Sequence, residues 1–98
     1  MVVKKSDIVV STAGRDKDKV FFVLEEDGQF AYIANGRERK IESPKRKKLK
    51  HLQLISKSEG RAAEKLRSGD RLTNSELRKA LADVQPVPDG ERGGMLNG

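Results

Sequence analysis

A chain of 98 residues has room for one domain with a small core, and 37% charged against 35% hydrophobic residues is the composition of a soluble protein. Cysteine is absent, which excludes disulfides, zinc sites built on thiolates and a cysteine nucleophile. The net charge of +6 and a pI near 9.8 favour a polyanionic partner, either a nucleic acid or an anionic membrane surface.

The hydropathy pattern gives no sign of a membrane span or a targeting segment. No stretch approaches the roughly 20 apolar residues that a spanning helix needs. The start, MVVKKSDIVV, contains no apolar run long enough for a signal peptide. We therefore expect a cytoplasmic protein.

The first half of the chain predicts short strands. Residues 8–10 are β-branched and end at the turn signal Ala13-Gly14. Residues 20–24 (VFFVL) are apolar on both faces, as in a central strand of a sheet or barrel. The turn signal Asp27-Gly28 precedes a third strand over residues 29–34.

A hairpin is predicted at Asn35-Gly36, because a type I′ turn needs positive φ at both central positions. It should fold residues 29–34 onto a fourth strand over 37–41, which Pro44 ends by removing a backbone donor. Residues 51–55 predict a fifth strand. Five such strands with short turns predict a mainly β fold, a small closed or half-closed barrel.

Two short helices are predicted after residue 57. The first covers 58–67, with Ser58 as its N-cap and Gly69 just past its end. Residues 73–76 (TNSE) fit a capping box that opens the second helix. Four residues of the second helix share one apolar face. We expect this face to pack on the barrel; the less favoured alternative is that it binds a partner. The four residues are Leu77, Ala80, Leu81 and Val84.

The predicted organisation has three parts: a barrel over residues 1–57, a helical extension over 58–84 and a tail over 85–98. The tail is rich in Pro and Gly and poor in core-forming residues, so we expect it to be disordered.

The positive charge is concentrated in residues 35–51. This stretch has eight basic and two acidic side chains, so it alone carries a net charge equal to that of the whole chain. Its basic members are Arg37, Arg39, Lys40, Lys45, Arg46, Lys47, Lys48 and Lys50. Such clustering indicates contact with phosphate groups rather than a solvated surface alone.

The sharpest local pattern is strand, glycine, charged loop and strand, over residues 7–24 (DIVVSTAGRDKDKVFFVL). A glycine at position 14 suits a strand that turns tightly into a basic loop, because positive φ or close approach to a phosphate penalises a Cβ. Asp18 also tolerates left-handed geometry. We expect the carboxylates of Asp16 and Asp18 to be exposed.

Residues 5–32 resemble a KOW motif, which is found in small SH3-like barrels of ribosomal and transcription-elongation proteins.

Over residues 5–84 the chain resembles a group of small bacterial KOW-domain RNA-binding proteins, similar to one class of large-subunit ribosomal proteins of archaea and eukaryotes. This resemblance rests on the segments AGRDK, PKRKKLKHLQ and LTNSELRKALAD, together with the predicted hairpin and its polar turn. It implies an SH3-like barrel that binds RNA, with ribosomal RNA and the ribosome or an assembly intermediate as partners in translation.

We therefore predict a non-catalytic, monomeric RNA-binding protein that contacts the phosphate backbone through basic loops and strands. The predicted RNA-binding residues are Gly14, Arg15, Lys17, Lys19, Arg37, Arg39, Lys40, Lys45, Arg46, Lys47, Lys48, Lys50 and His51. Phe30 and Tyr32 share a face of their strand, either in the core or as a stacking surface for an unpaired base.

Three other functions are less favoured. A transcription-elongation or DNA-binding accessory remains the alternative, although elongation factors of this kind usually carry a second domain and a DNA-reading helix would be basic. An enzyme is not expected, because no nucleophile–base pair, metal cluster or phosphate-cradling loop is visible; neither cofactor nor metal is predicted. Membrane binding is not expected, since neither helix is both basic and strongly amphipathic.

Overall fold

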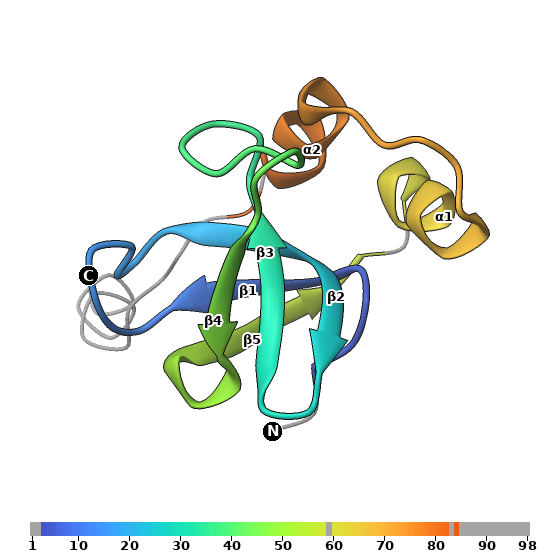
Figure 1. Cartoon of the computed structure of the whole chain (residues 1–98). Coiled ribbons are helices and arrows are strands. Elements are labelled where there is room, and N and C mark those ends of the chain that lie inside the picture. Colours follow the sequence, from blue (N-terminus) through green and yellow to red (C-terminus); the bar gives the residue numbers. More distant parts are fainter. Residues whose placement is uncertain (1–2, 59, 83, 85–98) are drawn as a thin grey trace, which may run out of the picture.

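A single curved antiparallel sheet organises the protein (Figure 1). The computed structural model describes residues 3–58, 60–82 and 84. The strands are β1 (Asp7–Ser11), β2 (Val20–Asp27), β3 (Phe30–Ala34), β4 (Lys45–Lys48) and β5 (Leu52–Lys57), in the spatial order β4-β3-β2-β1-β5. A 3₁₀ turn, η1 (Leu49–His51), joins the two edge strands β4 and β5. The predicted five-stranded, mainly β fold is confirmed; the predicted disordered tail lies outside the described residues.

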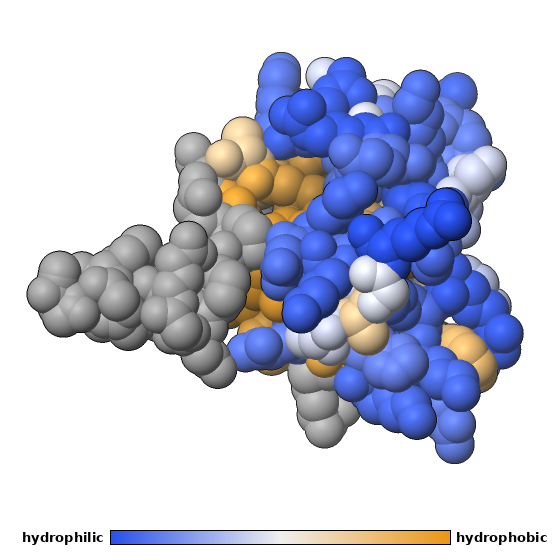
Figure 2. Space-filling model, turned by 90° about the vertical axis from the view of Figure 1, so that its left-hand side faces the viewer, coloured by the Kyte–Doolittle hydropathy of each residue, from blue (hydrophilic) through white to orange (hydrophobic). Residues whose placement is uncertain are grey.

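Both faces of the sheet bury apolar side chains. An inner cluster consists of Val3, Val9, Phe21, Val23, Ala31, Ile33 and Leu52. An outer cluster consists of Ile8, Phe22, Ala34, Ala62, Ala63, Leu72 and Leu77, the last four from the helical part of the chain. The adjacent Phe21 and Phe22 are both 0% exposed, one in each cluster, which confirms that β2 is a central strand. The face of the molecule shown in Figure 2 is mostly hydrophilic, with one contiguous apolar area in the left half of the view and smaller ones elsewhere.

The first helix, α1 (Arg61–Ser68), begins later than predicted. Its N-cap is Gly60, so the prediction of Ser58 as the N-cap is wrong. The backbone N–H of Ser58 instead donates to the carbonyl of Ser6 (3.2 Å), which keeps this residue tied to the segment before β1. The predicted end is confirmed, because Gly69 has φ of 83° and caps the helix in the left-handed conformation.

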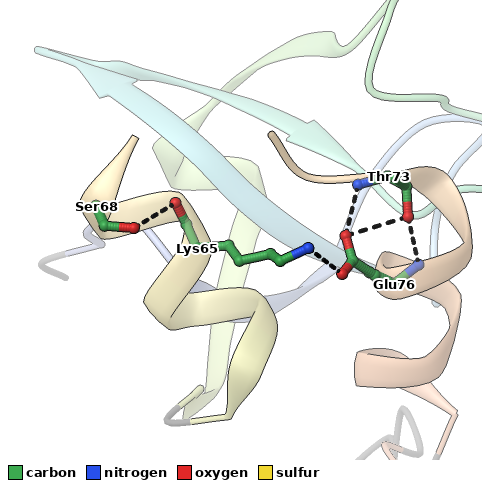
Figure 3. Close-up of polar contacts among 4 residues, drawn as sticks. All are labelled: Lys65, Ser68, Thr73 and Glu76. Carbon is green, nitrogen blue, oxygen red and sulfur yellow. Dashed lines mark hydrogen bonds and ion pairs between the residues drawn. The ribbon is translucent and has the colours of Figure 1, made fainter. Parts of the chain in front are cut away.

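The second helix, α2 (Asn74–Leu81), has the predicted capping box (Figure 3). Glu76 N donates to the Thr73 hydroxyl (3.1 Å), and Thr73 N donates to the Glu76 carboxylate (3.0 Å). The Lys65 ammonium also bonds that carboxylate and so connects α1 to α2. Together these bonds lower the pKa of Glu76 to about 2, and the bond from Lys65 has the largest effect. The predicted apolar face of α2 packs on the outer face of the sheet, with Leu77 fully buried.

The predicted hairpin at Asn35-Gly36 is wrong. Residues 35–44 form a loop, and the strand that pairs with β3 is β4, which begins just after Pro44. Of the two central residues only Gly36 has positive φ (77°), so the type I′ geometry is not formed. The Asn35 side chain instead accepts the backbone N–H groups of Arg37 (2.9 Å) and Arg39 (3.1 Å), which closes a wider turn.

This 35–44 loop is fixed against α2 (Figure 1). The Ile41 N–H donates to Asn74 Oδ1 (2.8 Å), and the Arg78 guanidinium donates to the Gly36 carbonyl (2.6 Å). A Cβ at position 36 would lie 2.5 Å from the Asn74 carbonyl oxygen, so only glycine fits there. The loop therefore has a defined conformation, which sets where β4 begins.

Candidate nucleic-acid interface

The fold brings the two basic segments of the sequence into contact. The Lys47 ammonium, from β4, donates to the carbonyl of Ala13 in the loop between β1 and β2 (2.7 Å). Lys45, two residues earlier, forms an ion pair with Asp16 of the same loop (3.3 Å). The 12–19 loop thus lies against the start of β4.

The 12–19 loop has the backbone geometry expected from its glycine. Gly14 has φ of 79° and Asp18 has φ of 73°, so both predicted left-handed positions are confirmed. The turn is closed by Lys17 N donating to Gly14 O (3.2 Å) and Asp18 N donating to Ser11 O (2.8 Å). Arg15 and Lys17 are exposed on this loop, and Lys19 is half-buried.

The expectation of an exposed Asp16 is wrong. Its side chain is turned inward and the residue is only 4% exposed. A buried carboxylate needs a partner of opposite charge, and Lys45 supplies it. Asp16 is therefore an internal anchor of the loop, and it directs Lys45 toward the protein.

The basic side chains of β4 alternate between two roles, because successive residues of a strand point to opposite faces. Lys45 and Lys47 point toward the 12–19 loop, whereas Arg46 and Lys48 are exposed. Lys47 is 8% exposed, and burial lowers its pKa, an effect that attraction to Asp16 offsets only in part. The Lys47 ammonium therefore holds the loop, and its predicted contact with RNA stays a prediction.

Arg46 lies on an aromatic ring of the neighbouring strand. Its guanidinium carbon is 3.5 Å from the centroid of the Phe30 ring, the geometry of a cation–π contact. Phe30 and Tyr32 alternate with inner-cluster residues, so they lie on the outer face of the sheet, and both are half-buried. Neither belongs to the two core clusters of the described residues. In the β3–β4 ladder, Tyr32 pairs with Arg46 and Phe30 with Lys48.

Acidic side chains border this aromatic pair on the other side. In the β2–β3 ladder, Glu25 pairs with Tyr32 and Asp27 with Phe30, and both acidic residues are exposed. The outer face of this half of the sheet is therefore acidic along β2, aromatic along β3 and basic along β4.

The other predicted residues are divided between surface and interior. Arg37, Lys40 and Lys50 are exposed, whereas Arg39 and His51 are half-buried. The His51 carbonyl accepts the N–H of Thr12 (2.9 Å), so η1 also lies against the start of the 12–19 loop.

A pocket of about 290 Å³ lies where the 12–19 loop, the 35–44 loop and α2 meet. Its charged lining residues are Asp18, Lys19, Arg37, Glu38 and Arg78. Asn35 Nδ2 donates to Glu38 (2.9 Å), and this bond, with smaller effects of nearby Lys19 and Arg37, lowers the pKa of Glu38. Mixed charges thus largely balance inside this pocket.

Sequence reasoning missed three residues that shape the site. Asp16 orients Lys45, while Asn35 and Arg78 fix the 35–44 loop. The Asn35-Gly36 pair does signal a turn, but nothing local indicates that Arg78, 42 residues away, binds it.

Neither a family model nor a curated protein matches the chain. Among the described residues, no group of three or more His, Cys, Asp or Glu side chains could hold a metal ion. No helix within this part of the chain is long and apolar enough to cross a membrane.

Proposed function

We propose that this protein binds RNA in the cytoplasm, without catalysing a reaction, by holding the phosphate backbone along a basic belt. The basic belt is the set of exposed basic side chains on the 12–19 loop, β4 and η1. Its members are Arg15, Lys17, Arg46, Lys48 and Lys50.

The observation that carries the proposal is the contact between the 12–19 loop and β4. The internal bonds of Lys47 to Ala13 and of Lys45 to Asp16 hold two basic segments together that are about 30 residues apart in the sequence. A high local density of cations favours a polyanion, since each phosphate contact releases condensed counterions.

The belt suits backbone binding better than the reading of a base sequence in duplex DNA. Reading the major groove requires a helix or ribbon that places side chains against base edges. Here the exposed basic side chains lie on loops and an edge strand. Such an arrangement favours contacts with phosphates, which position the nucleic acid without reading its sequence. Ribosomal RNA is the class of RNA that the KOW resemblance suggests, with the ribosome or an assembly intermediate as the partner.

The test is crosslinking of the tagged protein to RNA in its own cells, followed by sequencing of the bound fragments. Two triple variants with equal charge change are compared with the wild type. K17Q/K48Q/K50Q removes three cations of the basic belt, and R61Q/R71Q/K79Q removes three exposed cations of the helical part. We expect reads concentrated in a few ribosomal RNA segments for the wild type and the helical variant, and a loss of most reads for the belt variant.

Equal loss of reads in both variants, or RNA yields at background for the wild type, would contradict the proposal. Reads scattered in proportion to transcript abundance would contradict the ribosomal assignment and retain general backbone binding.

A further inference from the structure

The contact between Arg46 and Phe30 places a planar cation in a defined position on the surface. The guanidinium carbon is 3.5 Å from the ring centroid, a distance that fits a group lying roughly parallel to the ring, because an edge-on group would push a nitrogen atom into it. One face of the guanidinium is therefore covered, and the other is turned away from the ring. Arg46 is exposed and lies in an edge strand, so nothing in the sheet covers that second face.

The helices leave this part of the sheet uncovered. The outer cluster joins Ala34 of β3 and Phe22 of β2 to α1 and α2, whereas Phe30 and Tyr32, further along the same face of β3, are not part of it. Two half-buried aromatic residues and a flat arginine thus share one exposed area. Aromatic rings and arginine planes are the groups on which proteins stack unpaired bases.

We infer that Arg46, held flat by Phe30, is a stacking platform for one unpaired base, and that the RNA bound by the basic belt is single-stranded there. The inference rests on the proposed function and makes it more specific. In a duplex each base is already stacked and paired, so its face is not available to Arg46.

The charges around the platform indicate how the strand lies. Lys48 follows Arg46 on the same face of β4, and it lines a pocket of about 310 Å³ together with Gly28, Gln29, Leu49 and Lys50. On the opposite side of the platform lie Asp27 and Glu25, and Glu25 forms an ion pair with Lys5 (3.5 Å). Of the two carboxylates, Asp27 beside Phe30 therefore carries most of the repulsion. A phosphate next to the stacked base is attracted to the β4 side and repelled from Asp27, so the backbone follows β4 while the base points toward β3.

The test separates stacking from charge with arginine-to-lysine variants. R46K keeps the positive charge but replaces the planar guanidinium with an ammonium, which offers no flat surface to a base. R15K makes the same change on the 12–19 loop, where Arg15 lies on no aromatic ring of the described residues. The probe is a ten-nucleotide single-stranded RNA with one 2-aminopurine, whose fluorescence falls when the base stacks; a fully paired duplex of the same sequence is the comparison.

The wild type should bind the single strand with quenching and bind the duplex without it. R46K should lose about tenfold in affinity and most of the quenching, while its salt slope stays the same, because stacking contributes on the order of tenfold per base. R15K also keeps the charge of a basic-belt residue, so it should lose less affinity than R46K and should keep the quenching. F30L, which keeps Arg46 and removes its support, should lose quenching as well, with a thermal melt to confirm folding.

Equal effects of R46K and R15K, or equal quenching with the duplex, would overturn the inference while leaving RNA binding in place. If the wild type binds neither probe in a salt-dependent manner, the proposed function itself fails, and the two failures are thereby distinguished.

Discussion

Adjacent lysines in β4 have opposite roles. Lys47 is buried and its ammonium donates to the carbonyl of Ala13, whereas Lys48 is exposed beside Phe30. K47M should lower the free energy of unfolding by about 1–3 kcal/mol, the usual range for losing a charged hydrogen bond, here to the half-buried Ala13. K48M should change it by less than about 0.5 kcal/mol and should weaken RNA binding instead.

Denaturant unfolding of the two variants checks this difference, with RNA affinity measured in parallel. Equal stability of K47M and K48M would mean that Lys47 does not hold the 12–19 loop. Lys47 would then be returned to the set of possible phosphate contacts.

Glu76 predicts a specific effect of acid on stability. Its pKa is lowered from 4.5 to about 2, so the unfolded state binds a proton more readily than the folded state. Its contribution to stability is therefore present above pH 4.5 and is lost as the pH falls toward 2. E76Q keeps an amide able to cap α2 but cannot pair with the Lys65 ammonium.

Thermal melts across this pH range provide the measurement. Wild type should be more stable than E76Q at pH 6, and the difference should shrink between pH 4.5 and about 2 until the two proteins melt together. A difference that stays constant down to pH 2 would show that the ionised carboxylate is not its cause.

The limits of sequence reasoning at single positions follow from strand register. The count of charges identified residues 35–51 as basic, but it could not tell Lys47 from Lys48. Which of two neighbours points inward depends on the register Ala31 to Lys47, and that register depends on the length and fold of the 35–44 loop. The contact of Arg46 with Phe30 depends on the same register.

At the scale of elements, the 35–44 loop decides where β4 lies. Gly36 and Gly28 both have positive φ, 77° and 60°, but a Cβ at Gly36 meets the Asn74 carbonyl whereas nothing lies within 4 Å of one at Gly28. G28A should therefore cost only the backbone strain, about 1–2 kcal/mol. G36A has the same backbone strain and in addition pushes the loop away from α2. We therefore expect it to lower the free energy of unfolding by about 3–4 kcal/mol.

Denaturant unfolding of both glycine variants tests this, with RNA affinity as a second reading. G36A should also weaken RNA binding, because β4 and the basic belt move with the loop. Equal costs of G36A and G28A would contradict the role of the loop as a fixed spacer.

Elements with local signals were predictable, and those defined by distant partners were not. The strands around residues 8–10, 20–24 and 29–34 have β-branched or apolar patterns, and α2 has a complete capping box. By contrast, the β4 sequence KRKK has no apolar alternation at all. It forms a strand because it pairs with β3, and the residues predicted to fill that place, 37–41, are instead held in a loop by Asn35 and α2.

At the scale of the whole molecule, the sheet uses its two faces for different purposes. The inner face and one half of the outer face bury the core, with α1 and α2 over that half. Neither α1 nor α2 covers the other half of the outer face, and the edge strand β4 runs beside it (Figure 1). Stability and the proposed RNA binding are therefore located in different parts of the same sheet, and variants can separate them.

The most direct test of RNA binding through the basic belt is the salt dependence of affinity for a single-stranded RNA. Five phosphate contacts, one for each belt residue, predict a log–log slope of about −3.5, from roughly 0.7 per contact on single strands. K17Q/K48Q/K50Q should reduce the magnitude of this slope by about 2, and R61Q/R71Q/K79Q should leave it unchanged. A wild-type slope near zero, or the same slope in both triple variants, would contradict RNA binding through the belt.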